Sequence, residues 1–183
     1  MPPKETRRRK PLRLRGYDYA QEGAYFVTIC TQHRTCLFGE VVDGAMRLNG
    51  AGQLAATVWN SMLDRFPDIE LDMFVIMPNH LHGIIVLSDY DPRDTANTGA
   101  RVGTRPAPTI GEIVGAFKSL FTLRFAEGVR SKRWPPFDRR VWQRNYYEHV
   151  IRDERDLARV RRYIDENPLR WEFDQENPQR KTS

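Results

Sequence analysis

Hydrophobic residues fall in short, nearly continuous runs in some parts of the chain and at helical intervals in others. The short runs are rich in aromatic and β-branched residues and predict strands. These strands cover residues 24–30, 69–77 and 80–87. A further pair of short runs, within residues 35–48, predicts a hairpin because Asp43-Gly44 supplies a suitable two-residue turn.

Apolar residues spaced three and four apart predict helices in other segments. The predicted helices cover residues 51–66, 109–126 and 154–166, with a short one near 147–152. The resulting order is three strands, a helix, two strands and then helices. It indicates an α+β domain in which an antiparallel sheet carries its helices on one face.

The predicted domain, residues 23–173, lies between two polar ends. Residues 1–22 form a basic arm and residues 174–183 a polar tail. Residues 89–108 are rich in Asp, Thr, Gly, Ala and Pro without periodicity, which predicts a flexible insertion in the domain.

Composition narrows the class of protein. Hydrophobic residues make up 40% of the 183 positions, which is enough for a core and excludes a wholly disordered chain. No apolar run approaches the ~20 residues of a membrane helix, and the N-terminus lacks the apolar segment of a signal peptide. With only two cysteines, Cys30 and Cys36, a disulfide framework is excluded, and we expect a cytoplasmic protein.

Positive charge is concentrated in the N-terminal arm. The formal net charge is +5, and residues 1–15 hold seven Lys and Arg against the single Glu5. Such an arm can neutralise the phosphates of a nucleic acid. It can equally be a solvated tail that aids solubility, so the rest of the chain must decide.

His80 and His82 are the sharpest local signal in the sequence. On a strand they point to the same face, where two imidazoles can bind one metal ion. The alternative is a pair of polar histidines on a solvated face of the sheet. A zinc site would need a further ligand such as Cys30 or Cys36, whereas an oxygen ligand would suit Mg²⁺ or Mn²⁺ in phosphoryl transfer.

Tyr163 and Asn167 lie four residues apart on the last predicted helix and point from the same edge of it. They flank a stripe of Leu157, Val160 and Ile164 that we expect to be buried. The pair can offer a phenol and an amide to a site. Alternatively, the tyrosine lies at the border of the core and the asparagine ends the helix.

Several motifs occur in the same order as in a known family. They are Met77-Pro78-Asn79-His80-Leu81-His82, Phe117-Lys118-Ser119, the run from Val141 to His149 and the run from Tyr163 to Arg170. Through these motifs the chain resembles the REP-associated tyrosine transposases, a single-tyrosine group of the HUH (His-hydrophobic-His) transposases of single-stranded DNA. The resemblance extends from about Arg15 to Trp171.

The resemblance implies a ferredoxin-like antiparallel sheet with the His-Leu-His motif on a central strand and the catalytic tyrosine on a C-terminal helix. His80, His82 and Asn167 are then expected to bind a divalent metal ion, Mg²⁺ or Mn²⁺, and Tyr163 to be the nucleophile. Attack of the tyrosine on a DNA phosphate would form a 5′-phosphotyrosine, free a 3′-hydroxyl and allow later rejoining of the strand.

Other expected site residues have less specific signals. Tyr146 and Tyr147 are rival nucleophiles, which we disfavour because apolar residues lie four positions after them. His149 can be a ligand, a base or, as we expect, a structural histidine. The candidate DNA-binding residues are basic or aromatic; they are Arg7, Arg8, Arg9, Lys10, Arg13, Arg15, Lys118, Arg139, Arg140, Trp142 and Arg144.

The expected partner is single-stranded or hairpin DNA of the repetitive extragenic palindrome (REP) type. The relatives include monomers and also dimers that exchange their tyrosine helices, and we expect a monomer. Two other functions stay open, a catalytically silent DNA-binding module of the same fold and a zinc hydrolase of small molecules. The basic arm, and the lack of further His or Asp beside the His-Leu-His strand, disfavour the hydrolase.

Overall fold

The computed structural model describes residues 23–87 and 108–180. The predicted basic arm and nearly all of the predicted insertion therefore lie outside the described residues, as do residues 181–183.

The centre of the fold is a four-stranded antiparallel sheet in the order β4-β5-β1-β6. Its strands are β1 (Gly23–Cys30), β4 (Ile69–Ile76), β5 (His80–Leu87) and β6 (Tyr147–Ile151). The strand that begins with the two histidines, β5, thus lies between two neighbours. A separate hairpin of β2 (Gly39–Val42) and β3 (Ala45–Leu48) turns at Asp43 and Gly44, where φ is 53° and 74°.

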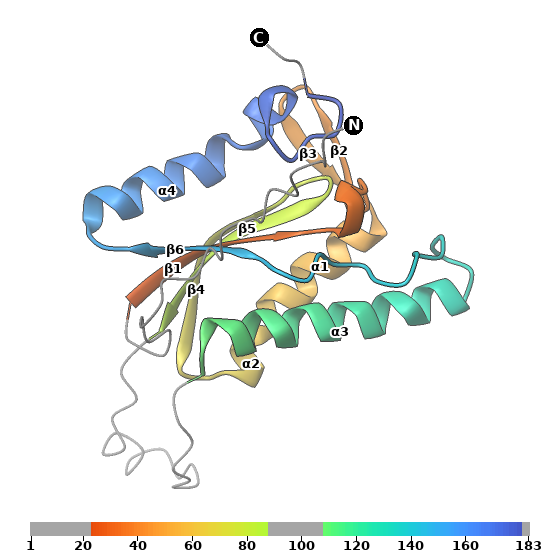
Figure 1. The fold of residues 1–183 in the computed structure, drawn as a ribbon, viewed down its shortest axis with the longest axis horizontal. Helices are drawn as coiled ribbons and strands as arrows, with labels where there is room; N and C mark the ends of the chain where they lie inside the picture. Colours follow the sequence, from red (N-terminus) through yellow and green to blue (C-terminus); the bar gives the residue numbers. More distant parts are fainter. Residues whose placement is uncertain (1–22, 88–107, 181–183) are drawn as a thin grey trace, which may run out of the picture.

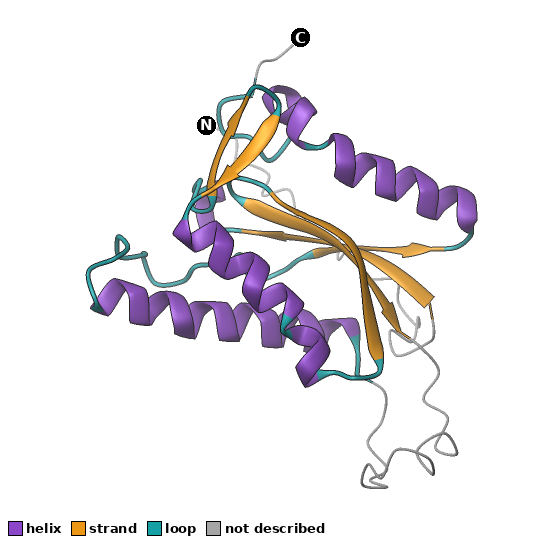
Figure 2. Ribbon diagram, turned by 180° about the vertical axis from the view of Figure 1, so that it is seen from behind, coloured by secondary structure: helices purple, strands orange, loops and turns teal. Residues whose placement is uncertain are grey.

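Helices cover both faces of the four-stranded sheet (Figures 1 and 2). The helices α1 (Gly50–Asn60), α2 (Met62–Arg65) and α3 (Ile110–Arg130) lie on one face, and α4 (Glu154–Glu166) lies on the other. The α+β class is confirmed, but the prediction that the helices share one face was wrong. The central strands are apolar at successive positions, so both of their faces need cover.

Successive residues of β1 enter two separate hydrophobic clusters. Tyr25 and Val27 belong to the larger cluster beneath α1 and α3. Phe26, on the other face, packs against Val160 and Ile164 of α4. The apolar stripe predicted for the last helix is therefore the surface that fixes α4 to the sheet.

The larger cluster explains why a glycine follows the second histidine. A Cβ atom at Gly83 would lie 2.5 Å from the indole of Trp59, which is fully buried on α1. Any larger residue would push the helix away from the sheet, so the strand and α1 approach closely only with glycine here.

Helix starts follow their capping residues. The side chain of Asn49 accepts hydrogen bonds from two backbone N–H groups at the start of α1. Thr109 and Glu112 form a capping box at the start of α3. The predicted helix over residues 51–66 is divided at Ser61 into α1 and α2, whereas α4 has the predicted bounds.

The segment near residues 147–152 forms the edge strand β6, so the prediction of a helix there was wrong. Its backbone pairs with β1 from Ala24↔Ile151 to Thr28↔Tyr147. Pairing with a strand more than a hundred residues earlier outweighs the local helical pattern, which a window of sequence cannot register.

Candidate active site

The two histidines of β5 form the floor of the site on the face that carries α4. His80 and His82 are 0% and 2% exposed, and their Nε2 atoms lie 2.9 Å apart. Two imidazole nitrogens converge here on one point, as the alternation of side chains along a strand predicts.

Neighbouring side chains orient both imidazoles through their other ring nitrogen. Nδ1–H of His80 donates to Oδ1 of Asn79 over 2.9 Å, which leaves the lone pair on Nε2. The hydroxyl of Thr28 lies 2.8 Å from Nδ1 of His82. Sequence reasoning assigned no role to Asn79 or Thr28. Asn79 directly precedes His80 in the quoted motif, so its adjacency is a usable signal, whereas the contact of Thr28 depends on the register of β1 against β5.

Burial keeps both histidines neutral near pH 7. It lowers the pKa of His80 to about 4, although the charge of Glu176 acts in the opposite direction. Burial also lowers the pKa of His82, and the neighbouring His80 adds to this effect. Neutral imidazoles are the form that binds metal ions.

This burial predicts that stability without metal depends on pH. In EDTA, the free energy of unfolding is expected to fall as the pH is lowered from 6.5 toward about 4. In that window the unfolded chain protonates His80 and the folded chain does not, so the unfolded state binds more protons and stability falls by up to about 1.4 kcal/mol per pH unit. Urea titrations at about pH 7 and about pH 5 measure the change. His80→Gln should flatten the profile; an equal slope in this variant would contradict the assignment.

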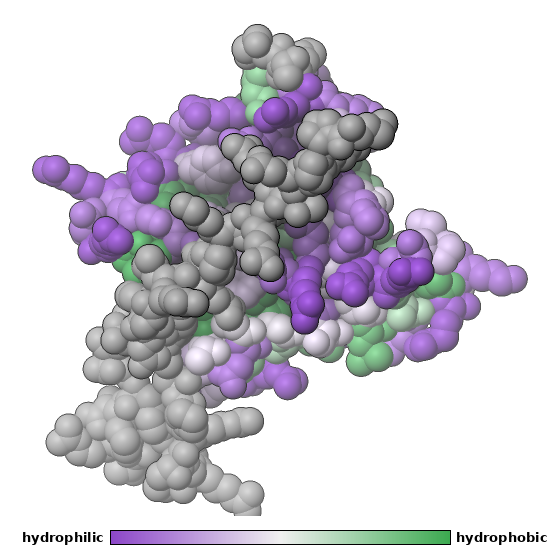
Figure 3. Space-filling model, viewed as in Figure 1, coloured by the Kyte–Doolittle hydropathy of each residue, from purple (hydrophilic) through white to green (hydrophobic). Residues whose placement is uncertain are grey.

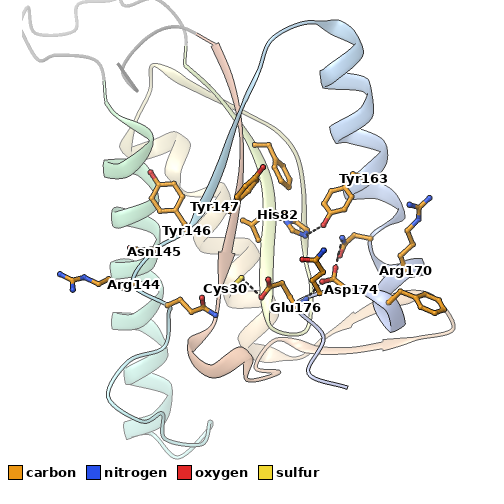
Figure 4. A pocket seen from close by; sticks show the side chains of 16 residues that line it. Cys30, His82, Arg144, Asn145, Tyr146, Tyr147, Tyr163, Arg170, Asp174 and Glu176 are labelled. Atoms are coloured by element: carbon orange, nitrogen blue, oxygen red, sulfur yellow. Dashed lines mark hydrogen bonds between the residues drawn. The ribbon is translucent and has the colours of Figure 1, made fainter. Parts of the chain in front are cut away.

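Tyr163 reaches the histidines from α4. Its hydroxyl lies 3.3 Å from Nε2 of His82 (Figure 4). Its ring packs edge-on against Phe26, with centroids 5.9 Å apart. The side chain is 42% exposed, so it borders both the site and solvent. Burial raises the pKa of Tyr163, and the charge of Asp174 raises it further, so the phenol is protonated in the free protein.

Asn167 ends α4 and is buried next to the histidines. Its Nδ2 donates to Asp174 over 3.4 Å, while Oδ1 has no hydrogen-bond partner among the described residues. A buried amide oxygen without a partner is costly, and a bound cation would satisfy it. Asn167 is the C-cap of the helix, which agrees with one interpretation of the sequence. Its Oδ1 could serve as an oxygen ligand, which is the other interpretation.

Two carboxylates enter the site from the segment after α4. The ligand atoms of His80, His82 and Asp174 all lie within 4.8 Å of one another. Glu176 lies close by, where its carboxylate accepts a hydrogen bond from the thiol of Cys30 over 3.5 Å. Sequence reasoning took residues 174–183 for a polar tail and missed both acids, because nothing in their local pattern distinguishes them from solvated residues.

The cysteines do not join the histidine group. Among the described residues, the group of possible ligand atoms around the histidines includes neither cysteine. Burial and the nearby Glu176 raise the pKa of the Cys30 thiol to about 12, and this thiol donates to Glu176 instead. Cys36 is exposed. This arrangement gives no support to the zinc site considered from the sequence.

A cleft of about 1030 Å³ opens above these residues (Figure 4). Tyr163 and Asp174 lie along one side of it, while Tyr146 and Tyr147 lie on the opposite side. Tyr147 contacts the edge of the Phe26 ring, with centroids 6.3 Å apart. Of the three candidate nucleophiles, Tyr163 is the one whose hydroxyl is within hydrogen-bond distance of a site histidine.

The structure separates the candidate DNA-binding residues into groups. Arg139, Arg140 and Arg144 are exposed, and Arg144 lines the cleft. Lys118 instead donates to the backbone carbonyls of residues 143–145, at distances of 3.0 to 3.5 Å, and so holds one wall of the cleft in place. The six candidate residues of the arm, which lie between Arg7 and Arg15, are outside the described residues.

Trp142 cannot stack on DNA bases, because it is buried in the larger cluster. Its ring lies 5.5, 5.3 and 5.1 Å from the rings of Phe38, Phe117 and Phe121. The expectation of a stacking surface at this residue was wrong. A tryptophan between arginines gives the same local pattern whether it faces the core or a ligand.

Trp142→Ala is therefore expected to act on stability. Removing this ring from the core should lower the free energy of unfolding by about 3–5 kcal/mol, whereas Arg139→Ala, at an exposed position, should change it by less than about 0.5 kcal/mol. Urea unfolding measures both values. If Trp142→Ala instead leaves stability unchanged and weakens DNA binding, Trp142 contacts DNA as first expected.

His149 has a structural partner. Its Nε2 lies 2.7 Å from a carboxylate oxygen of Asp156, which joins β6 to α4 on the side of the sheet that carries the site. The expectation of a structural histidine agrees with this contact.

Comparisons with known proteins place the chain among relatives. No family model matches it. An uncharacterised protein of Haemophilus influenzae is 41% identical over 176 residues, which cover 91% of this chain and 92% of that protein. A second protein of the same organism, named a REP-associated tyrosine transposase, is 26% identical over 156 residues and is matched over 74% of its length by 84% of this chain.

A solved structure has the same fold. It is described as a REP-associated tyrosine transposase bound to a REP hairpin, and it matches 86% of this chain with a TM-score of 0.58 and 21% identity, over 73% of its own chain. The described residues of the present chain contain no helix long and apolar enough to cross a membrane. These relationships support a DNA-processing function of the transposase kind. The chain is therefore similar in sequence to one REP-associated tyrosine transposase and has the fold of another.

Proposed function

We propose that the protein nicks and rejoins single-stranded, hairpin-associated DNA through a metal-dependent reaction in which Tyr163 becomes covalently linked to the strand. One observation carries this proposal. The Tyr163 hydroxyl lies 3.3 Å from Nε2 of His82, beside a group of two imidazoles and a carboxylate whose ligand atoms lie within 4.8 Å of one another.

The donor set fits a divalent cation. His80, His82 and Asp174 supply two neutral nitrogens and a carboxylate, and Oδ1 of Asn167 is a buried oxygen with no hydrogen-bond partner in the part of the chain that the structure describes. Imidazole nitrogens suit transition-metal ions, and the carboxylate and amide oxygens suit Mn²⁺ or Mg²⁺, which are the ions we propose here. A cation bound there would supply positive charge to a phosphate oxygen and make the phosphorus more open to attack.

The reaction needs the phenol oxygen to act as a nucleophile at phosphorus. In the proposed step a bond forms between the Tyr163 oxygen and phosphorus, the bond from phosphorus to O3′ breaks, the phenol loses its proton, and the leaving O3′ gains one. The products are a 5′-phosphotyrosine and a free 3′-hydroxyl. Because the new ester retains the energy of the broken one, a 3′-hydroxyl can reverse the step and rejoin the strand.

The cleft suits an unpaired strand. Two exposed aromatic side chains that line the cleft, Tyr147 and Phe173, offer faces for stacking of bases. Arg144 and Arg170, which also line the cleft, can contact phosphates. The basic arm of residues 1–22 would add further phosphate contacts on the hairpin.

The test detects the covalent product directly. The protein is incubated with Mn²⁺ and a hairpin DNA from the flanks of its own gene, labelled at the 5′ end in one sample and at the 3′ end in another. A denaturing gel should show the 3′-labelled fragment linked to protein and sensitive to protease, with no product in EDTA. DNA that is bound but uncut in hairpins from both flanks would favour the catalytically silent binding module.

A further inference from the structure

A second pocket adjoins the cleft and is lined by basic side chains. It has a volume of about 550 Å³ and shares Gln143, Arg144 and Asn145 with the cleft. Arg34 and Arg140 also line it, and none of the described residues that line it is acidic. Figure 3 shows hydrophilic side chains over the connection that leads from α3 to β6, which carries Arg140 and Arg144. In Figure 4 the Arg144 side chain points outward from the cleft. We call this the Arg34 pocket.

The backbone beneath the Arg34 pocket is strained and firmly held. His33 and Arg34 have φ of 58° and 56°, a left-handed backbone conformation that residues other than glycine rarely adopt. The turn is fixed by backbone hydrogen bonds at its start, from Thr31 to Asn79 over 2.9 Å and from Gln32 to Val141 over 2.7 Å. Strained residues that their surroundings hold in place are common at ligand sites.

Arg34 is held by a carboxylate that can stand in for a phosphate. Its Nε and Nη2 donate to the two oxygens of Glu176 at 2.8 and 3.4 Å. The planar guanidinium binds the oxygens of a carboxylate or of a phosphate in this same paired manner. The Arg34 side chain is 42% exposed in this pair, so a ligand can reach it from solvent.

The Arg34 pocket is linked directly to the histidine site. Nδ2 of Asn79 donates to the backbone carbonyls of Arg34 and Glu176, at 3.0 and 2.7 Å, while its Oδ1 accepts from His80. Asn79 therefore positions the proposed metal ligand His80 together with the backbone of Arg34 and of Glu176, whose carboxylate pairs with Arg34. The pocket also shares Gln143, Arg144 and Asn145 with the cleft, so a strand bound in the cleft can continue into it.

We propose that the Arg34 pocket binds phosphate groups of the single DNA strand beside the scissile position, and that Glu176 occupies Arg34 until DNA displaces it. The proposal rests on the proposed function, because it takes single-stranded DNA as the ligand of the cleft. It adds a binding subsite and a competing side chain, neither of which takes part in the covalent step.

The test measures binding alone, in a Tyr163→Phe background that cannot form the proposed covalent product. The affinity for a fluorescein-labelled hairpin with a single-stranded extension is followed by anisotropy over a series of salt concentrations. Arg34→Gln should lower the slope of log K against log salt by about 0.7, the amount for one phosphate contact on a single strand. Arg144→Gln serves as a second variant, and Arg65→Gln, on α2 across the sheet, should leave the slope unchanged. Thermal melts establish that each variant is folded.

Glu176→Gln tests the competing carboxylate. It should tighten binding by about threefold when Arg34 is present and have no effect in an Arg34→Gln protein, because the two side chains then act as one coupled pair. Equal tightening in both backgrounds would show general repulsion and overturn the competition. Binding with a wild-type slope in Arg34→Gln and Arg144→Gln would overturn the pocket while leaving the covalent chemistry intact. A third outcome is that Arg34→Gln lowers the slope as expected, but the wild-type protein never forms the covalent product. That result would support the pocket and contradict only the proposed reaction.

Discussion

Tyr163→Phe is expected to reduce formation of the covalent protein–DNA product by at least about a thousandfold, because it removes the oxygen that attacks phosphorus. The ring itself should stay in place against Phe26 and His82, since only the hydroxyl is lost. DNA binding and thermal stability should therefore be close to those of the wild-type protein. A denaturing gel with 3′-labelled hairpin DNA measures the product, and anisotropy measures the binding.

Two tyrosines on the opposite wall of the cleft provide matched controls. Tyr146→Phe and Tyr147→Phe remove the same atom from residues that line the same cleft, and they should retain most of the product. A covalent product that persists in Tyr163→Phe and disappears in one of these variants would transfer the nucleophile to that residue. The contact between Tyr163 and His82 would then be structural.

His82→Ala is expected to lower both Mn²⁺ affinity and product formation by at least about a hundredfold, because it removes a nitrogen ligand from the proposed site. It also removes the side chain that lies between the hydroxyl of Thr28 and that of Tyr163. Isothermal titration calorimetry measures the affinity for Mn²⁺ in the absence of DNA, and therefore without any cleavage. The loss of metal affinity and the loss of product should therefore be seen in separate assays.

The control for this variant is His149→Ala, which removes an imidazole that is paired with Asp156 of α4. It should retain Mn²⁺ binding and product formation. Asp174→Asn provides a graded comparison, with weaker metal binding than the wild type, if its carboxylate is the third ligand. Full Mn²⁺ affinity in a folded His82→Ala protein would rule out the histidine pair as the metal site.

Most elements of the fold, and the central pair of the site, could be predicted from short patterns. The strand at residues 80–87 and the helix at residues 154–166 have the bounds that their periodicities indicate. The close spacing of His80 and His82, and of Tyr163 and Asn167, depends only on the geometry of one strand and one helix, so local reasoning was sufficient there.

What local reasoning missed depends on pairing between distant segments. Thr28 reaches His82 only through the register of β1 against β5, and β6 is a strand only because β1 offers it an edge. Asp174 enters the site because the chain turns back after α4. The opposite error occurred at Trp142, whose basic neighbours suggested a surface although its ring lies in the core.

The packing of α4 against the sheet of its own chain bears on whether two copies of the chain can exchange their tyrosine helices. Val160 and Ile164 bury the helix against Phe26 of the same chain, and this packing brings Tyr163 to a histidine of the same subunit. To place Tyr163 in the site of another copy, α4 would have to leave its own sheet and expose Val160 and Ile164 to water during the exchange. The whole proposed site then lies within one chain, so we expect that a copy that lacks the tyrosine and a copy that lacks the histidine do not complement each other on simple mixing.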